Sequence, residues 1–340
     1  MAAHPIAADY GKTWTRLLPE SRYLYADDAE GEGAPGNWTR RFPHRIDSLS
    51  GKPDNSFVTN WERSPFSTTF VVDLAIHLLQ KRALGTRDGT DLLALGLSSL
   101  DLVGHEFGPR SHEVQDVLAR ADADIGRLLD TLDRQVGPRN FVLAFSSDHG
   151  VAPVPEQATA DGLDAGRIAG SDLRGAANRA IAAALGPGTY VGAADTHISL
   201  VPGTYERLRA TTGAIEAVRA ALAAVPGIER VFTTEELAGT EPTDDVLLRR
   251  WRLSYVAGRS GDFIVSPRPY WIIRTGAGTT HGTPGAYDSH VPVLLFGGSI
   301  RAGRYAGTTS PADIVPTLAS LTGISLTQTS GRVLKEALSR

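Results

Sequence analysis

The chain has 340 residues, a formal net charge of −4 at pH 7 and no cysteine. Its length and its 41% share of hydrophobic residues allow a large apolar core in one or two domains. The acidic balance, with no basic stripe, argues against nucleic acid or an acidic membrane as a partner, and the lack of cysteine excludes disulfides, thiolate metal sites and a cysteine nucleophile within these residues.

Residues 1–60 are predicted to form an irregular segment that covers a core built elsewhere. Gly31, Gly33, Pro35 and Gly36 interrupt any regular pattern, and the apolar residues are scattered. Residues 1–14 show neither the charged region nor the apolar region of a signal peptide, and no apolar run in the chain reaches the ~18–20 residues of a membrane span.

Residues 61–155 are predicted to hold the core unit, a strand, a helix and a second strand. After an initial helix that begins at Ser64-Pro65, the run DLLALGLSS from residue 91 and the run NFVLAFSS from residue 140 each have the length of a buried strand. Between them, apolar residues recur at helical spacing over 114–132. The polar face of that helix is expected to leave five aspartates solvated: Asp116, Asp122, Asp124, Asp130 and Asp133.

Each of these predicted strands is followed by an acid and a histidine. Asp101-x-x-x-His105 is expected in the loop after the first strand, and Asp148-His149-Gly150 follows the second. Carboxyl ends of neighbouring parallel strands meet at one edge, where open sheets bind ligands. Carboxylates and neutral imidazoles are zinc ligands, and two such pairs could hold two cations ~3.5–4 Å apart. Either motif alone is explained by a cap, a turn or a packed histidine, whereas the two together favour a metal site.

The rest of the chain is predicted to form a lid and then return to the sheet. Residues 156–260 are expected to be a smaller lid or insertion with helices over 173–185, 205–225 and 244–255 and a hairpin over 189–203. Residues 261–340 supply further strands, a loop rich in Gly and Thr, and a last helix from Ser310-Pro311. The predicted fold is therefore α/β, a mainly parallel sheet sandwiched by helices, with a smaller lid region.

The motifs DLVGHEFGP and SSDHGV, the run THGTPGAYDSHVPVLLFGGSIRAG and the segment SPADIVPTLASLTGI resemble the alkaline phosphatase superfamily. The similarity is greatest to its zinc-dependent alkaline phosphatases and type I phosphodiesterase/nucleotide pyrophosphatases, and it covers the chain from residue 10 onward. The resemblance implies hydrolysis of phosphate esters by a Ser or Thr nucleophile and two zinc ions.

The same resemblance implies the ligands. Asp101, His105 and His281 would bind the first zinc, and Asp148 and His149 the second. His290 is either a supporting residue or the ligand in place of His281, and that choice is open. In the family, the second zinc also binds an Asp and the nucleophile, which lie on the N-terminal side. This sequence offers no match for either, since Thr13 and Thr15 lack the nucleophile's context.

Three functions remain open at this point. The first is a zinc-dependent phosphate monoester hydrolase that is incomplete in this chain. The second is a phosphodiesterase or nucleotide pyrophosphatase, and the third is a non-catalytic metal-binding fragment or pseudoenzyme, so whether the chain is an enzyme is also open. The expected partner is a small phosphate ester, with neither nucleic acid nor membrane involved. Relatives are often periplasmic or secreted, but the localisation of this chain is left open.

Overall fold

The computed structural model describes residues 5–339, so residues 1–4 of the predicted covering segment and residue 340 lie outside the described part. The chain forms two compact units. Unit 1 comprises the residues up to Asp28, Ala34–Gly150 and the residues from His290 onward, and unit 2 comprises Ala29–Gly33 and Val151–Ser289. Within the described residues, no helix combines the length and the apolar character that crossing a bilayer would need.

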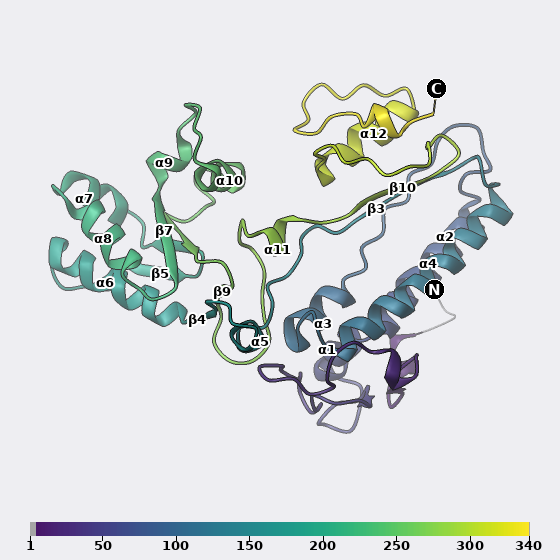
Figure 1. Cartoon of the computed structure of the whole chain (residues 1–340), viewed down its shortest axis with the longest axis horizontal. Helices are drawn as coiled ribbons and strands as arrows, with labels where there is room; N and C mark the ends of the chain where they lie inside the picture. Colours follow the sequence, from purple (N-terminus) through teal and green to yellow (C-terminus); the bar gives the residue numbers. More distant parts are fainter. Residues whose placement is uncertain (1–4, 340) are drawn as a thin grey trace. The chain divides into compact units, whose positions relative to one another are not determined.

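Unit 1 is mainly helical (Figure 1). Its elements are strands β1 (Thr13–Trp14), β2 (His44–Arg45), β3 (Val142–Ser146) and β10 (Val293–Gly297), α-helices α1 (Asn55–Glu62), α2 (Pro65–Arg82), α3 (Ser99–Phe107), α4 (His112–Gln135) and α12 (Ile314–Leu321), and 3-10 helices η1 (Ile6–Asp9), η2 (Glu20–Arg22), η3 (Pro311–Asp313) and η4 (Lys335–Ala337). The long helices α2 and α4 lie side by side, and Leu128 of α4 packs with Val72, Ala75 and Leu79 of α2. Both helices were predicted from their periodicity, and both are confirmed.

The prediction for the segment before α4 is wrong in two respects. Residues 91–97 form no strand, and Asp101-x-x-x-His105 lies on helix α3 rather than in a loop. The reason is the packing of α3: Val103 and Phe107, four residues apart, are fully buried in an aromatic cluster with Trp14 and Trp38. Helical spacing places residues 101 and 105 on the opposite face.

The α/β class is confirmed, but the strand directions differ from the predicted, mainly parallel arrangement. Strand β3 pairs with β10 in antiparallel fashion, with Phe145 opposite Leu294. Within the described residues, the pairing of β4 with β9 in unit 2 is the one parallel contact. The predicted parallel crossover needed a strand at 91–97 that pairs with β3. Because residues 91–97 form no strand, α4 does not connect two parallel strands.

Unit 2 contains a four-stranded antiparallel sheet with helices on both faces (Figure 1). The sheet order is β5-β6-β8-β7. The elements are strands β4 (Gly166–Ile168), β5 (Val191–Ala194), β6 (His197–Leu200), β7 (Ile228–Thr233), β8 (Phe263–Pro267) and β9 (Trp271–Ile273), and helices α5 (Pro155–Ala160), α6 (Gly170–Leu185), α7 (Thr204–Ala210), α8 (Ala214–Ala223), α9 (Thr234–Ala238), α10 (Val246–Ser254) and α11 (Ala286–Ser289).

Alternation along β8 explains why both faces of this sheet are covered. Phe263 and Val265 face the core formed with α6, α7 and α8, whereas Ile264 packs with Trp251 of α10. Successive side chains of a strand point to opposite faces, so an uninterrupted apolar strand needs cover on both. The predicted single helix over 205–225 is two helices, α7 and α8, because Gly213 lies between them with a φ of +74°.

Two of the five aspartates on α4 are buried rather than solvated. The side chain of Asp116 is 0% exposed and accepts hydrogen bonds from Trp14 Nε1 and the Leu17 backbone N–H, each at 2.6 Å, and from the Tyr23 hydroxyl at 2.5 Å. Asp124, also buried, accepts a hydrogen bond from Thr69 of α2 at 2.7 Å. Asp116 therefore attaches the irregular covering segment to α4.

A buried histidine and carboxyl form a second link beneath α3. His44 Nε2 lies 2.7 Å from Glu113 Oε1, and both side chains are 0% exposed. The ring of Phe107, at the end of α3, lies 5.3 Å from the His44 ring. Burial raises the pKa of Glu113 to about 8 and lowers the pKa of His44 to about 4, so both shifts favour neutral groups.

Replacing Glu113 by glutamine should flatten the alkaline side of the stability profile. The raised pKa of Glu113 stabilises the fold fully below its ordinary value of 4.5, and this stabilisation is lost as the pH rises through about 8. The depressed pKa of His44 has the opposite sign, with its stabilisation complete above 6.5, so the interval from pH 6.5 to 8 isolates Glu113. Urea unfolding should show the wild-type free energy of unfolding falling across this interval and a shallower fall in Glu113→Gln. Equal slopes would contradict the prediction, and Glu229→Gln at an exposed site is the control.

Candidate metal centre

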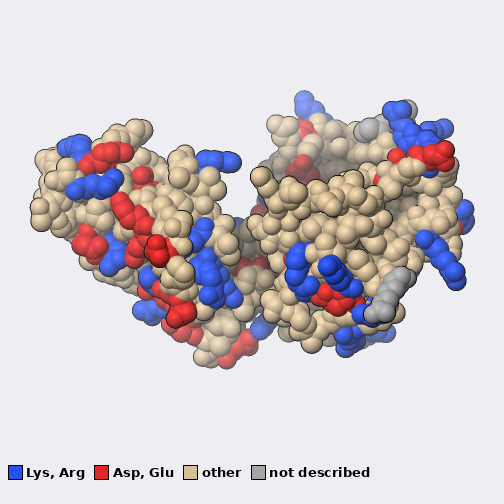
Figure 2. Space-filling model, turned by 90° about the horizontal axis from the view of Figure 1, so that it is seen from above, with Lys and Arg blue, Asp and Glu red and all other residues tan. Residues whose placement is uncertain are grey.

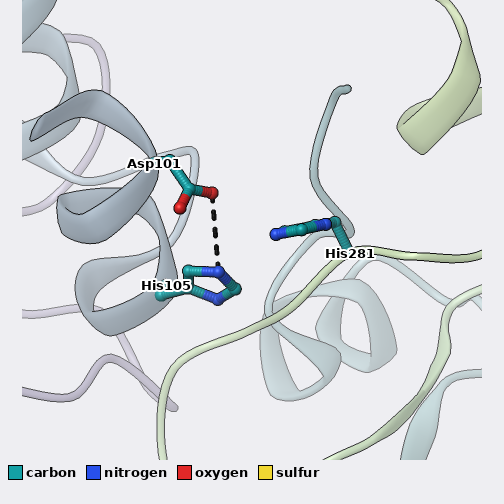
Figure 3. A group of neighbouring side chains, drawn as sticks. All are labelled: Asp101, His105 and His281. Atoms are coloured by element: carbon teal, nitrogen blue, oxygen red, sulfur yellow. Dashed lines mark ion pairs between the residues drawn. The ribbon is translucent and has the colours of Figure 1, made fainter. Parts of the chain in front are cut away.

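Helix α3 carries the side chains of Asp101 and His105 (Figure 3). Helical spacing places them on the face opposite Val103 and Phe107, which pack in the aromatic cluster. His105 Nε2 lies 3.4 Å from Asp101 Oδ1, and the two side chains are 22% and 37% exposed. The buried face carries Val103 and Phe107, and a hydrogen bond between the Ser99 and Thr68 hydroxyls attaches the start of α3 to α2. The helix is thus held on one side, which fixes the positions of Asp101 and His105 on the other.

The loop after β3 brings His149 to the same carboxylate. His149 Nε2 lies 3.9 Å from Asp101 Oδ1, while its Nδ1 lies 2.8 Å from the Gly150 carbonyl oxygen. A carbonyl oxygen can only accept, so Nδ1 carries the hydrogen and Nε2 keeps its lone pair in the neutral ring. This is the tautomer that a metal-binding histidine needs, with the other nitrogen oriented by a backbone carbonyl.

Asp148 has a different setting. Its side chain is 87% exposed, and Oδ2 lies 3.6 Å from His149 Nε2. The hydroxyls of the two preceding serines support the loop: Ser147 donates to the His149 carbonyl at 2.5 Å, and Ser146 donates to the Pro292 carbonyl beside β10 at 2.9 Å. The predicted order of strand, acid and histidine is found here, with Asp148 and His149 directly after β3.

The donor set fits a cation. Asp101 offers a carboxylate, and His149 Nε2 lies 3.9 Å from its Oδ1, so a neutral imidazole would bring two electron-rich groups together. Such groups repel unless a proton or a metal ion lies between them. Ligands at about 2.0–2.2 Å from a tetrahedral zinc ion lie roughly 3.3–3.6 Å apart. The 3.4 Å between Asp101 and His105 falls in this range.

His281 belongs to unit 2, in the loop after β9. Asp101, His105 and His281 are all half-buried, and each offers an atom that can bind a metal (Figure 3). Two hydrogen bonds attach the residues before His281 to the chain just after His149: the Ala152 N–H donates to the Thr280 carbonyl at 3.2 Å, and the Thr279 hydroxyl donates to the Ala152 carbonyl at 2.9 Å. Local sequence gave no sign of this attachment, because Ala152 and Thr279 are 127 residues apart.

The alternative histidine, His290, is exposed and lies at the start of the segment that leads into β10. The nearby Asp288 is buried and accepts hydrogen bonds from the Thr283 backbone at 2.8 Å and hydroxyl at 2.7 Å. Asp288 therefore closes the turn that follows His281. Nothing in these contacts decides between His281 and His290 as the ligand, so the choice stays a prediction.

The segments that carry Asp101, His149 and His281 lie within a stretch that matches a known protein family. Residues 8–288 match the type I phosphodiesterase / nucleotide pyrophosphatase family. The chain belongs to this family. The predicted resemblance to the alkaline phosphatase superfamily is thereby confirmed.

Relatives of this phosphodiesterase family member include two bacterial proteins. The chain is 30% identical over 324 residues to a calcium-transporting ATPase of Myroides odoratus, and the match covers 92% of this chain and 58% of the relative. It is 28% identical over 338 residues to alkaline phosphatase PafA of Elizabethkingia meningoseptica, and this match covers 96% of this chain and 60% of the relative. The chain thus spans less than two thirds of the length of these curated relatives.

A solved structure of wild-type alkaline phosphatase PafA matches this family member with a TM-score of 0.86 and 27% identity. The match covers 97% of this chain and 63% of that chain. The α/β fold described above is therefore an alkaline phosphatase-like fold.

Proposed function

We propose that this chain supplies zinc ligands for the hydrolysis of phosphoric esters, and that the esters are monoesters. Membership of the phosphodiesterase family and similarity to alkaline phosphatase PafA support the reaction class. The observation that carries the proposal is the position of the Asp101 carboxylate, with His105 Nε2 at 3.4 Å and His149 Nε2 at 3.9 Å. Asp101 and His105 come from helix α3 and His149 from the loop after β3, so the fold brings two separate segments together, as expected for a metal centre.

In this proposal Asp101, His105 and His281 bind one zinc ion, and Asp148 and His149 bind a second. When bound, zinc supplies positive charge beside the phosphoryl oxygens, where negative charge develops in the reaction. The protein's own contribution is orientation. Helix α3 presents Asp101 and His105 one turn apart, and the Gly150 carbonyl holds the His149 tautomer whose Nε2 can bind metal.

The proposal assigns no nucleophile to this chain. Ser146 and Ser147 are the hydroxyl residues nearest in sequence to the Asp148-His149 pair, and both donate to backbone carbonyls. Their role is to hold the loop. Zinc binding and ester hydrolysis by the isolated chain are therefore separate questions, and the experiment must measure both.

Phosphodiester hydrolysis is the second candidate, and the family match favours it. Monoesters are preferred here because PafA, an alkaline phosphatase, matches almost the whole chain. The proposed substrate in either case is a small phosphate ester. The net charge of −4 argues against a polyanionic partner such as nucleic acid, as does Figure 2, in which Lys and Arg side chains are interspersed with Asp and Glu side chains on the face shown.

The test is the zinc content of the purified chain after dialysis, measured with the hydrolysis of p-nitrophenyl phosphate and of bis(p-nitrophenyl) phosphate. We expect retained zinc and faster turnover of the monoester. Faster turnover of the diester would favour the phosphodiesterase alternative. Zinc without turnover of either ester would favour the non-catalytic metal-binding alternative, and a chain that retains no zinc would contradict all three.

A further inference from the structure

Arg167 on β4 makes a contact in unit 2 that the proposed chemistry does not yet use. Its Nε and Nη2 donate to the two carboxylate oxygens of Glu156, both at 2.7 Å, and Nη2 also donates to the Gly278 carbonyl at 2.8 Å. The Arg167 side chain is 17% exposed. Its hydrogen bonds hold the pKa of Glu156 below the ordinary value, so the pair is ionised. Two-point pairing of this kind fixes the guanidinium in orientation as well as in position.

The residue that Arg167 holds lies three positions before His281. Both backbone polar groups of Gly278 are hydrogen-bonded: its N–H donates to the Gly31 carbonyl at 2.7 Å, and its carbonyl accepts from Arg167. The next two residues, Thr279 and Thr280, are attached to Ala152. Each residue from Gly278 to Thr280 therefore has a fixed hydrogen-bond partner, and His281 follows directly.

Gly31 allows its own backbone segment to approach Glu156 closely. Its φ is +79°, and a Cβ built there would collide with the side chains of Glu156 and Val154. A larger residue at position 31 would thus displace either the Glu156 carboxylate or the backbone at residue 31, whose carbonyl accepts the hydrogen bond from Gly278. The arrangement of Gly31, Glu156, Arg167 and Gly278 is a closely packed support for one loop.

We propose that Arg167, oriented by Glu156, is a positioning residue that sets the loop containing His281 so that this histidine can bind zinc. The inference rests on the proposed function, since it assigns Arg167 a role in the same metal centre. Arg167 acts through the backbone at Gly278 and touches neither substrate nor metal. A lysine could not replace it, because an ammonium group lacks the planar fork that meets Glu156 and Gly278 together.

The test measures zinc affinity by competition with a chromophoric chelator for the wild type, Arg167→Met, Arg167→Lys and the double variant Arg167→Met/Glu156→Gln. The double variant removes the unpaired carboxylate that Arg167→Met leaves, so it separates loss of positioning from a folding defect. We expect each variant to bind the zinc of the His281 site about 10-fold more weakly or worse, within the ~10–100-fold range for residues that support a ligand. Arg268→Met is the matched control, because Arg268 forms an exposed ion pair with Asp164 in the same unit at 3.5 Å.

The decisive readout is the effect of Arg167→Met in a His281→Ala background. If Arg167 acts through His281, the second substitution adds no further loss of zinc affinity. An equal loss in both backgrounds, or wild-type affinity in Arg167→Met, would overturn the inference. His290→Ala is the control for His281→Ala. A wild type that binds no zinc would instead overturn the proposed function, and a wild type whose zinc affinity depends on His290 rather than His281 would overturn the ligand assignment and this inference with it.

Discussion

Asp101→Ala should release zinc from the centre on α3, with a loss of affinity larger than the ~10–100-fold that a supporting residue contributes. Asp101 is the one carboxylate that lies within 4 Å of both His105 and His149 among the described contacts, with Nε2 atoms at 3.4 Å and 3.9 Å from its Oδ1. In the proposed first site, its removal leaves His105 and His281 without the negative charge that offsets the charge of the metal. Elemental analysis after dialysis, followed by chelator competition, measures the loss.

The fold should survive this substitution. The Asp101 side chain is 37% exposed and lies on the face of α3 away from Val103 and Phe107, so the variant and the wild type should unfold at the same temperature when both are metal-free. Asp101→Asn keeps the shape and one oxygen donor but removes the charge, and should give an intermediate affinity. Asp130→Ala, at an exposed site on α4, is the matched control. Wild-type zinc content in Asp101→Ala would refute its role as a ligand.

Part of this site can be predicted from the sequence alone. Strand β3 was predicted from NFVLAFSS, so Asp148 and His149 were expected at its end, and they are found there. The helix α4 was predicted from apolar spacing, which is strong over its 24 residues. Long periodic segments and the residues that follow them are therefore within reach of sequence reasoning.

Helix α3 was missed because its local signals conflict. Residues 92–97 of the run DLLALGLSS are apolar without a break, and periodicity cannot separate a strand from other buried structure in so short a run. Two glycines, Gly104 and Gly108, then favoured a loop. The helix is decided by burial of Val103 and Phe107 against Trp14 and Trp38, which come from a segment more than 60 residues earlier. Local sequence does not reveal that contact.

The same limit applies to the supporting residues. Arg167 and Gly278 are 111 residues apart, and Trp14 and Asp116 are 102 residues apart. Asp116 also falls on the polar face of α4, where helical spacing predicts solvation. The covering segment removes it from water instead, because that segment supplies the Trp14, Leu17 and Tyr23 donors. A buried carboxylate in a polar stripe can be recognised only once its partners are placed.

Asp116→Ala should be among the most destabilising substitutions in unit 1, with a loss of about 3–5 kcal/mol in the free energy of unfolding. It would leave the buried Trp14 N–H and Tyr23 hydroxyl without an acceptor, and would remove the partner of Arg120, whose Nε lies 2.6 Å from Asp116 Oδ2. Burial and the hydrogen bond to Asp116 raise the pKa of Tyr23 to about 12, so the phenol remains a donor across the working range of pH. Urea unfolding at neutral pH measures the loss.

One milder variant tells whether charge or hydrogen bonding holds the covering segment. Asp116→Asn keeps an acceptor for Trp14 or Tyr23 but gives up the charge that pairs with Arg120, so it should lose less than Asp116→Ala. Asp122→Ala, at an exposed site on the same helix, should change the free energy of unfolding by less than about 0.5 kcal/mol. A loss below about 1 kcal/mol in Asp116→Ala would mean that water replaces the carboxylate at small cost. In that case the aromatic packing of Trp14, rather than Asp116, would hold residues 13–25 against α4.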